Sequence, residues 1–473
     1  MQVKSMFFKQ TASAKLNDAV LQRAMKNAKG KFVDGRAASV ATIDNWEAIR
    51  SHAAALRDQV INNLDAYLIE FEQKAIARGA VVHWAETADE ANAIIIKIAQ
   101  DNQVKTITKS KSMVSEEVAL NDALEAVGIA VLETDLGEYI LQLANEPPSH
   151  IVAPAVHKSK EQVAQLFVDH HHRPRLNDIA AMTREAREVL RERFLSADMG
   201  ISGANFVVAE TGTTLTVTNE GNADMVTTIP RIHCVITGIE KVIPTLEDFA
   251  TLIRLLPRSA IGQSITNYLT LTTGVKKPDE QEGPEQMHIV LVDAGRTKLV
   301  GSEMREMLRC IRCGACMNHC PVYQNVGGHA YGWVYPGPMG SVLTPVYQGI
   351  ENAGDLPNAS TFCGECQVVC PVKIPLPDLM RKLREQQFEQ KLRPLGERFG
   401  IAVWSFFVSR PVLYALATLI GARVASWLGG REKMIRKLPG LDGWTSGRDL
   451  PAPAGKTFRE LYQQRQADQK AKR

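Results

Sequence analysis

Short apolar runs and amphipathic stretches alternate through the middle of this 473-residue chain. Apolar runs of four to six residues, typical of strands, are followed by segments with apolar residues at a helical spacing of three or four. Strands that alternate with helices favour βαβ units and a parallel sheet, so we predict an α/β domain over residues 69–300. The expected strands are residues 80–84, 105–108, 129–133, 149–155, 206–209, 214–218, 225–229, 232–238 and 288–293, and the expected helices are residues 87–98, 116–127, 160–167 and 183–195.

Helices are expected on both sides of this domain. Residues 14–28 and 46–68 each have one apolar face, which predicts an N-terminal helical arm over residues 1–68. Near the other end, residues 401–428 are apolar but are interrupted by Arg410 and Pro411. Neither uninterrupted run reaches the roughly 18 residues that span a bilayer. We therefore predict helices packed against a partner or a membrane surface rather than a transmembrane helix.

The composition is that of an ordinary soluble globular protein, with 45% hydrophobic and 23% charged residues. The net charge of +3 hides an asymmetry, because residues 371–473 carry 20 Lys or Arg against 9 Asp or Glu and the rest of the chain is acidic. Such a basic tail indicates a docking surface for an acidic partner or an anionic membrane face, and a solvated helical tail is the alternative. Nucleic-acid binding is not expected, because the tail lacks an aromatic stacking platform.

The cysteines indicate a reducing compartment. Seven of the eight lie between residues 310 and 370, which is the arrangement of a cofactor site rather than of a disulfide framework. The first ten residues contain no apolar core and no small-residue cleavage site, so no secretory signal is expected. We therefore expect a cytoplasmic, oxygen-sensitive protein, with the inner face of the membrane as the surface that its basic tail could contact.

Two cysteine motifs carry the chemistry. The first is Cys310-x2-Cys313-x2-Cys316-x3-Cys320 followed by proline, the run that binds [4Fe–4S] clusters in bacterial two-cluster ferredoxins. In that run three cysteines hold one cluster and the fourth reaches the other. The second motif lacks its first member, because Ser360 stands three residues before Cys363. The crossed rule then gives cluster 1 the ligands Cys310, Cys313, Cys316 and Cys370, and cluster 2 the ligands Cys320, Cys363 and Cys366.

The fourth ligand of cluster 2 stays open at this point. Ser360 Oγ, a water, an outside ligand or a three-iron cluster could each complete the site. A zinc site is the alternative reading of C-x2-C pairs. Zinc needs only four ligands, whereas seven cysteines stand here in ferredoxin register with proline after both terminal members. Two [4Fe–4S] clusters in a ferredoxin-like domain over residues 301–390 are therefore the better prediction.

Polar loops with glycine at strand ends could form the rim of a small-ligand site, because glycine lets a backbone approach a ligand closely. Ordinary hairpin turns are the alternative, and from the residues alone they are the better explanation. The candidate rim residues are Glu210, Thr211, Gly212, Glu220, Asn222, Glu240 and Lys241.

These features together resemble one family, the lactate-utilization iron–sulfur proteins of the LutB/YkgF type. The loops at residues 209–213, 220–222 and 238–241 resemble its LUD domain, and the cysteine motifs with residues 335–340 resemble its ferredoxin-like segment. Residues 444–451 and 456–459 resemble its C-terminal domain, here residues 391–473, so the resemblance covers essentially the whole chain.

The resemblance implies a LUD domain with a fold similar to the NagB/RpiA/CoA-transferase group, then an α-helical ferredoxin-like two-cluster domain and a helical C-terminal region. It also implies an assembly with two other subunits that oxidises L-lactate to pyruvate and passes electrons toward the respiratory chain, with the clusters in this chain. Serine at the position of Ser360 is usual in that family.

The residues alone leave other functions open. No G-x-G-x-x-G dinucleotide loop is present, so the chain is incomplete as a dehydrogenase on its own. An iron–sulfur subunit of another respiratory dehydrogenase or of a heterodisulfide-reductase-like complex would carry the same cysteine motifs. A non-redox module that binds a small carboxylate, with structural clusters, is the third alternative.

Overall fold

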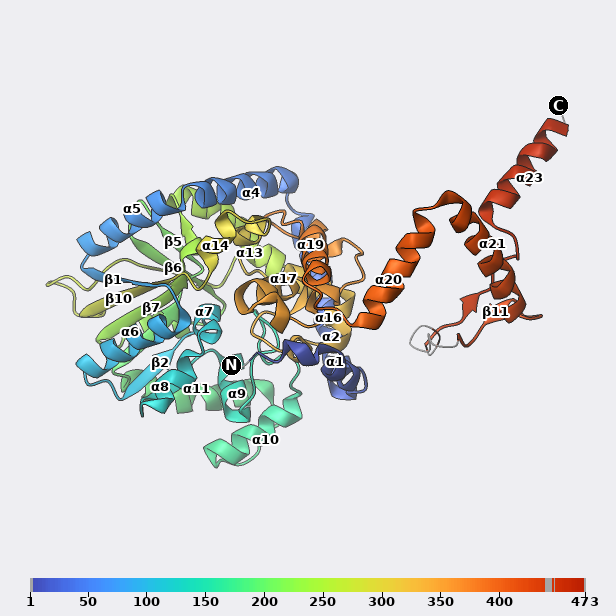
Figure 1. The fold of residues 1–473 in the computed structure, drawn as a ribbon. Coiled ribbons are helices and arrows are strands. Elements are labelled where there is room, and N and C mark those ends of the chain that lie inside the picture. The colour runs from blue at the N-terminus through green and yellow to red at the C-terminus, as the bar shows by residue number, and fades with distance from the viewer. Residues whose placement is uncertain (1–2, 439–444, 446, 472–473) are drawn as a thin grey trace. The chain divides into compact units, whose positions relative to one another are not determined.

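The chain forms two compact units, Met1–Gln386 and Gln387–Arg473. The computed structural model describes residues 3–438, 445 and 447–471. The first unit contains the α/β part, the cysteine segment and the N-terminal helices, and the second unit contains the C-terminal helices (Figure 1).

A six-stranded parallel sheet forms the framework of the first unit, in the order β1-β10-β7-β4-β2-β3. The central strands β4 and β7 are buried at every residue, as expected for parallel strands covered on both faces. Because every pair is parallel, the carboxyl ends of the strands meet at one edge of the sheet. The strands are β1 (Ala80–Ala85), β2 (Thr106–Lys109), β3 (Ala130–Glu133), β4 (Met199–Gly203), β7 (Ile232–Gly238) and β10 (Gln286–Val292).

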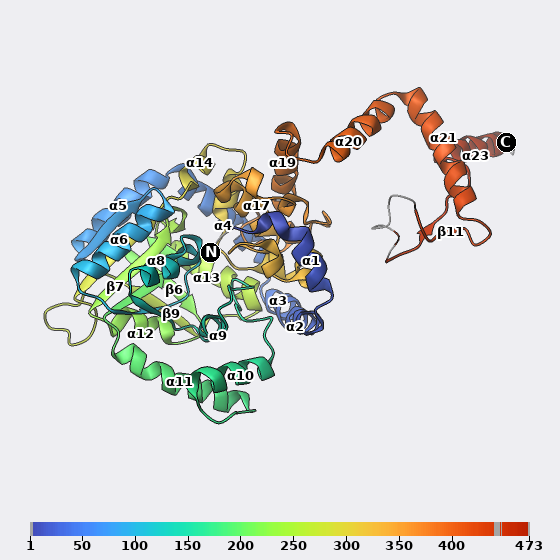
Figure 2. The same cartoon turned by 60° about the horizontal axis from the view of Figure 1, so that its bottom comes forward.

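The helices of the α/β part start at clear capping residues. Thr87 caps α6, Asp135 caps α9, and Thr245 makes a capping box at α13. α10 and α11 lie together beside the sheet, and share a small core with α9 (Figure 2). The helices are α5 (Leu64–Ala77), α6 (Ala88–Asp101), α7 (Met113–Glu117), α8 (Leu120–Ala126), α9 (Leu136–Ala144), α10 (Lys160–His171), α11 (Ile179–Leu195), α12 (Asn222–Thr228), α13 (Leu246–Ile261) and α14 (Arg296–Val300).

A second sheet of four short strands has the order β8-β5-β6-β9. β5 pairs with β8 in parallel, whereas β6 pairs antiparallel with both β5 and β9. The strands are β5 (Phe206–Val208), β6 (Thr213–Thr218), β8 (Val242–Ile243) and β9 (Tyr268–Thr272), with η3 (Ile239–Lys241) just before β8.

The cysteine segment consists of short helices, and the N-terminal helices pack on it. The amide N–H of Lys4 donates to the Gly332 carbonyl at 2.8 Å, and Phe8 makes an edge contact with the Tyr331 ring. The segment predicted as an arm is thus part of the first unit. These elements are η1 (Ser5–Phe7), α1 (Phe8–Leu16), α2 (Ala19–Lys29), η2 (Gly30–Asp34), α3 (Gly35–Val40), α4 (Trp46–Asn62), η4 (Arg305–Arg309), α15 (Ala315–Asn318), α16 (Pro321–Val326), η5 (His329–Tyr331), α17 (Gly337–Gln348), η6 (Ile350–Asn352), η7 (Leu356–Asn358), α18 (Glu365–Val368) and α19 (Leu376–Glu389).

The second unit contains two exposed apolar helices, α20 (Leu395–Val408) and α21 (Pro411–Leu428), and neither has a buried residue. The apolar run that the sequence places at residues 411–422 continues as helix to Leu428. α21 is therefore 18 residues long with a mean hydropathy of 1.4, enough by length and composition alone to cross a membrane. The unit also contains β11 (Met434–Ile435), β12 (Leu450–Pro451) and α23 (Phe458–Ala471).

The mixed α/β architecture with a parallel sheet is confirmed, but several predicted elements are wrong. Residues 225–229, expected to form a strand, lie in and just after α12. This helix packs so closely on β4 that a Cβ on Gly200 would lie 1.9 Å from the Val226 carbonyl oxygen. The expected strand at residues 149–155 is a turn, because His150 Nδ1 accepts the N–H groups of residues 152 and 153. The helices expected at residues 14–28, 46–68 and 116–127 are each broken once, near Asn17, Asn63 and Ala119.

Candidate iron–sulfur centre

The two cysteine motifs adopt the same backbone conformation. Arg312 and Phe362, each just before the second cysteine position of its motif, have positive φ angles of 57° and 55°. The glycines that follow those cysteines have φ angles of 79° and 83° and start the short helices α15 and α18. The two motifs are thus a local structural repeat that relates Cys313 to Cys363, Cys316 to Cys366 and Cys320 to Cys370.

This repeat places Ser360 where the first motif has Cys310. The Cys310 sulfur accepts the backbone N–H of Arg312 at 3.4 Å, and the Ser360 hydroxyl oxygen accepts the backbone N–H of Phe362 at 3.1 Å. The serine hydroxyl therefore has the same relation to the following turn as the first thiolate of the other motif.

The cysteines interact in two groups. Burial and then the thiolates of Cys370 and Cys310 raise the pKa of Cys313. Burial and then the thiolates of Cys313 and Cys310 raise the pKa of Cys316. Burial and then Cys320 and Cys363 raise the pKa of Cys366 to about 12. An interaction between Cys316 and Cys366 joins the groups. The first group is Cys310, Cys313, Cys316 and Cys370, and the second is Cys320, Cys363 and Cys366.

The number and register of the cysteines do not match a single zinc ion. Zinc is bound by four ligands, whereas the two groups together supply seven cysteines. In an iron–sulfur cluster each thiolate binds a different iron, and the two motifs have the spacing found in two-cluster ferredoxins. The residues present fit such a cluster better than a zinc ion.

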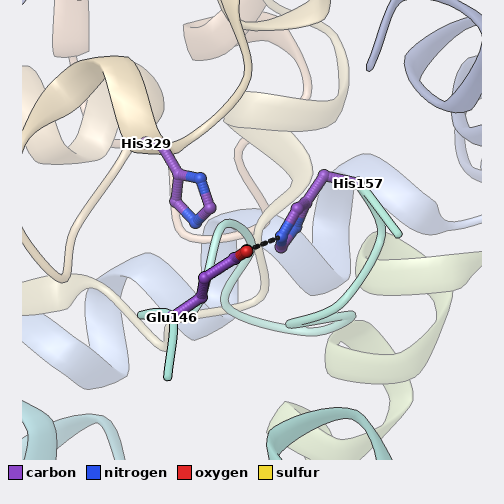
Figure 3. Close-up of side chains that lie close together, drawn as sticks. All are labelled: Glu146, His157 and His329. Carbon is purple, nitrogen blue, oxygen red and sulfur yellow. Dashed lines mark hydrogen bonds and ion pairs between the residues drawn. The ribbon is translucent and has the colours of Figure 1, made fainter. Parts of the chain in front are cut away.

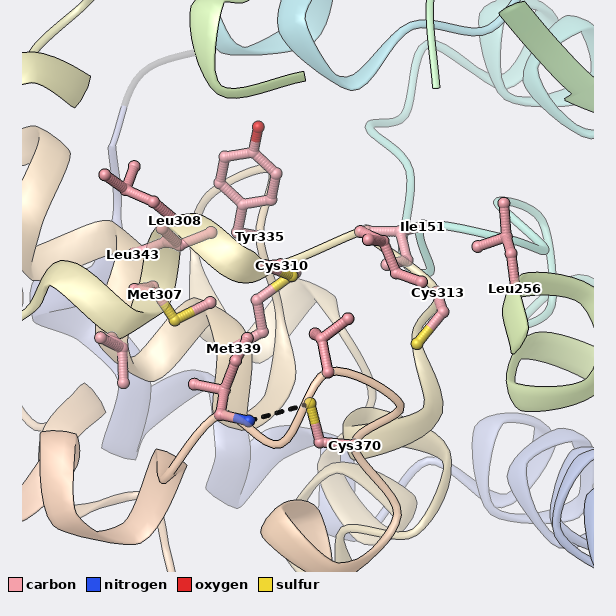
Figure 4. Packing of buried hydrophobic residues seen from close by; sticks show 14 of the residues in the cluster. Ile151, Leu256, Met307, Leu308, Cys310, Cys313, Tyr335, Met339, Leu343 and Cys370 are labelled. Atoms are coloured by element: carbon pink, nitrogen blue, oxygen red, sulfur yellow. Dashed lines mark hydrogen bonds between the residues drawn. The ribbon is translucent and has the colours of Figure 1, made fainter. Parts of the chain in front are cut away.

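The two groups differ in their exposure to solvent. Cys310, Cys313 and Cys370 are buried among apolar side chains such as Met307 and Met339 (Figure 4). In the second group Cys320 and Cys366 are buried, whereas Cys363 is exposed. Cys316, the remaining member of the first group, is partly exposed. The first group therefore lies mostly inside the unit, whereas the second reaches its surface at Cys363.

Arginines of α4 hold the backbone around the first group. The Arg50 guanidinium donates to the Cys370 carbonyl at 2.7 and 3.0 Å and to the Val368 carbonyl at 2.7 Å. Arg57, fully buried, donates to the Val242 carbonyl at 3.0 Å and the Leu308 carbonyl at 3.1 Å. One N-terminal helix thus fixes both ends of the cysteine segment and links it to the α/β part.

A buried ion network connects the carboxyl edge of the sheet with Cys310. Arg296 pairs with Glu240 at 2.6 Å and with both oxygens of Glu117 at 2.9 Å, and the Tyr335 hydroxyl donates to Glu117 at 2.7 Å. Burial alone would raise the pKa of Glu240, but the positive charges of Arg296, Lys241 and Arg312 lower it to about 2.

Cys310 itself faces several of these cations. Burial and then Arg312 lower the pKa of Lys241 to about 8, while the negative charge of the Cys310 thiolate opposes this shift. The same thiolate interacts with Arg57 and Arg312. Positive charge beside a ligand stabilises added negative charge there, which is one way in which a protein raises the reduction potential of a cluster.

The candidate rim residues do not come together. Glu210 accepts the Leu246 N–H at 2.7 Å, at the start of α13. A Cβ on Gly212 would lie 2.4 Å from the backbone of α5. The turn that contains Thr211 therefore packs against these two helices. Glu220 accepts the Leu136 N–H at 3.1 Å, and burial and Asp135 raise its pKa to about 7. The Asn222 amide donates to Thr134 Oγ1 at 3.1 Å, while Glu240 and Lys241 lie in the network near Cys310.

A second polar cluster lies at the carboxyl ends of β2 and β3. Lys109, fully buried, contacts Glu133 at 2.8 Å and Glu116 at 3.0 Å. Burial and then Glu133 raise the pKa of the buried Glu138 carboxyl well above its usual range. Both Glu138 oxygens and the Lys111 ammonium are buried without a hydrogen-bond partner among the described residues. The available signal in the sequence is residues 109–112, Lys-Ser-Lys-Ser, a polar run that begins at the last residue of β2.

Comparison with known families divides the chain into three parts. The LUD domain matches residues 68–292, a 4Fe-4S dicluster domain matches residues 306–374, and the C-terminal domain of lactate utilisation protein B matches residues 379–467. Lactate utilization protein B of Macrococcus caseolyticus is 42% identical over 469 residues, which cover 98% of both chains. The chain belongs to the lactate utilization protein B family.

Other members of this family are equally similar. The uncharacterized electron transport protein YkgF of Escherichia coli is 41% identical over 463 residues, 98% of both chains, and lactate utilization protein B of Oceanobacillus iheyensis is 41% identical over 98% of this chain and 97% of its own. Among solved structures, a DUF162 family protein from Deinococcus radiodurans is 16% identical to this chain, and the match covers 48% of this chain and 98% of that protein. The TM-score is 0.28, so this similarity is too weak to bear on the fold.

In this member of the lactate utilization protein B family, replacing Ser360 should test its role. Ser360→Cys should supply a thiolate and suppress conversion of cluster 2 to a three-iron form in air, because iron–sulfur sites select thiolates. Ser360→Ala should increase that conversion if the hydroxyl is a ligand. Electron paramagnetic resonance after brief air exposure measures the three-iron signal, and an unchanged signal in both variants would show that Ser360 only stabilises the turn.

Proposed function

We propose that this chain is the iron–sulfur electron-transfer subunit of a complex that oxidises L-lactate to pyruvate and passes electrons toward the respiratory chain. The observation that carries the proposal is the repeat of two cysteine motifs with equal backbone geometry, within a chain of the lactate utilization protein B family. Two of its relatives are named for lactate utilization and one for electron transport.

Two [4Fe–4S] clusters with crossed ligands are the proposed cofactors. Cys310, Cys313, Cys316 and Cys370 would hold cluster 1, and Cys320, Cys363 and Cys366 would hold cluster 2, with Ser360 in the fourth position. Such clusters, when bound, move one electron at a time. Cys363 is exposed whereas the first group is mostly buried, which supports an exchange of electrons with a partner near cluster 2.

Lactate oxidation releases two electrons, so a further site must divide the pair. We propose that two other subunits complete the complex and that it is cytoplasmic, with the second unit at the inner face of the membrane or on a partner. The exposed apolar helices α20 and α21 and the basic charge of residues 371–473 support this arrangement.

Deleting residues 391–473 should leave the iron content of the protein nearly unchanged but weaken its association with partners or membranes. The deletion keeps α19 (Leu376–Glu389) whole, and the cysteine segment belongs to the other compact unit. Co-purification and vesicle sedimentation measure the effect.

A matched variant, with Arg431, Lys433, Arg436 and Lys437 changed to glutamine, should lose binding at 0.1 M salt more than at 1 M salt, because the Debye length falls from about 10 Å to about 3 Å. Unchanged association of both variants would remove the docking proposal.

We also propose that the α/β part binds a small carboxylic acid at the carboxyl edge of its sheet, where ligands of open α/β sheets usually bind. The buried and unpartnered Lys111 ammonium and Glu138 carboxyl support this. A NagB/RpiA/CoA-transferase-like fold for this part is a further proposal, supported by its six parallel strands with helices between them.

The direct test of the proposed function is cluster reduction by substrate. The chain is purified anaerobically with its two partner subunits and mixed with L-lactate, with D-lactate as the control. We expect bleaching of the iron–sulfur absorbance and a reduced-cluster resonance signal with L-lactate. A complex that binds L-lactate without any reduction would support the non-redox alternative, and reduction by a different donor only would support another respiratory dehydrogenase.

A further inference from the structure

Outside the cysteine segment, three side chains converge in the way that metal ligands do. A carboxylate oxygen of Glu146 and one ring nitrogen each of His157 and His329 all lie within 4.8 Å of one another (Figure 3). Glu146 follows α9 and His157 lies in the turn before α10, whereas His329 begins η5 between the two cysteine motifs. We propose that these three residues bind a divalent transition-metal ion, with Zn²⁺ as the ion to test.

The geometry needs only small adjustments to accept the ion. Zinc lies about 2.0–2.2 Å from nitrogen and oxygen ligands, so neighbouring ligand atoms of a tetrahedral site are roughly 3.3–3.6 Å apart. His157 Nε2 lies 2.9 Å from Glu146 Oε2, and the rings of His157 and His329 are 4.5 Å apart between centroids. Lys158 contacts the other carboxylate oxygen, Oε1, at 2.5 Å, which leaves Oε2 for the ion.

The supporting contacts are those of a metal site. His157 Nδ1 lies 2.7 Å from the Ser149 hydroxyl and His329 Nε2 lies 2.8 Å from the Pro147 carbonyl, which orient both rings.

Room for a fourth ligand is available. The three residues line a cavity of about 310 Å³, which also has Lys15, Asp18 and Gln162 on its wall. Two histidines and one carboxylate leave one position of a tetrahedral ion for water, as in catalytic zinc sites. The ion would join the α/β part to η5, whose Tyr331 lies beside Cys320.

The test is zinc binding by the anaerobically purified full chain with its clusters loaded, followed by X-ray absorption at the zinc edge. We expect one zinc per chain with only nitrogen and oxygen neighbours at about 2.0–2.2 Å, because sulfur neighbours would appear near 2.3 Å. His157→Ala and His329→Ala should each lower the affinity at least tenfold. His288→Ala should not, because His288 pairs with His83, 3.1 Å away, and is not one of the three proposed ligands.

Iron content and circular dichroism verify that each variant is folded, and His157→Gln and His329→Gln replace any alanine variant that is not. Zinc bound only through sulfur, no zinc at all, or equal zinc affinity in the His157, His329 and His288 variants would overturn the proposal. None of these outcomes depends on lactate oxidation, so the metal site and the proposed function fail independently.

Discussion

Cys370→Ser should damage cluster 1, while the signal of cluster 2 remains largely present. The crossed assignment places Cys370 with Cys310 and Cys313, and the first motif then lacks its fourth thiolate. Cys320→Ser should have the opposite effect. The backbone at residue 370 should hold its place in the variant, because Arg50 donates to its carbonyl oxygen and not to its side chain.

Brief exposure to air distinguishes a defect in cluster 1 from a defect in cluster 2. Cluster 2, with three cysteines, is expected to give the three-iron resonance signal after brief exposure, so this signal should persist in Cys370→Ser and vanish in Cys320→Ser. Cys234→Ala is the control, because Cys234 is buried in β7 outside both motifs. Equal loss of both clusters from either folded variant would contradict the crossed assignment.

Arg296→Met should lower the free energy of unfolding of the first unit by about 3–5 kcal/mol, because it would leave the carboxylates of Glu117 and Glu240 buried without their main positive partner. Urea denaturation followed by circular dichroism measures the change. Arg173→Met is the matched control: the Arg173–Glu188 pair is exposed and should contribute roughly 0–1 kcal/mol. A change below about 1 kcal/mol for Arg296→Met would show that the buried network is not needed for stability.

Sequence periodicity predicts most of the parallel sheet, because its strands are short, apolar and separated by amphipathic helices. Periodicity predicts the wrong element where tertiary contacts determine the backbone conformation. Residues 225–229 are as apolar as a strand but form a helical turn, since α12 packs closely on Gly200 of β4. β4 itself, Met199–Gly203, contains two glycines and has no apolar pattern that would identify it.

For the candidate site too, the sequence predicts the local pattern but not the tertiary contacts. Cysteine spacing is a local property, so the two motifs can be read directly from the chain. The residues around the motifs cannot be predicted from the chain in this way. Arg50 is 320 positions from Cys370, whose carbonyl it binds. Glu117 and Arg296, which form the buried ion pair, belong to other elements. Loop composition predicts the candidate rim, but the structure distributes its members over three places.

The number and type of metal centres in the anaerobically purified chain test the central claim most directly. Quantification of iron and acid-labile sulfide, together with electron paramagnetic resonance of the reduced protein, should give about eight irons and eight sulfides per chain and two cluster signals. Zinc bound by the cysteines, with no labile sulfide, would contradict the proposal that this segment transfers electrons.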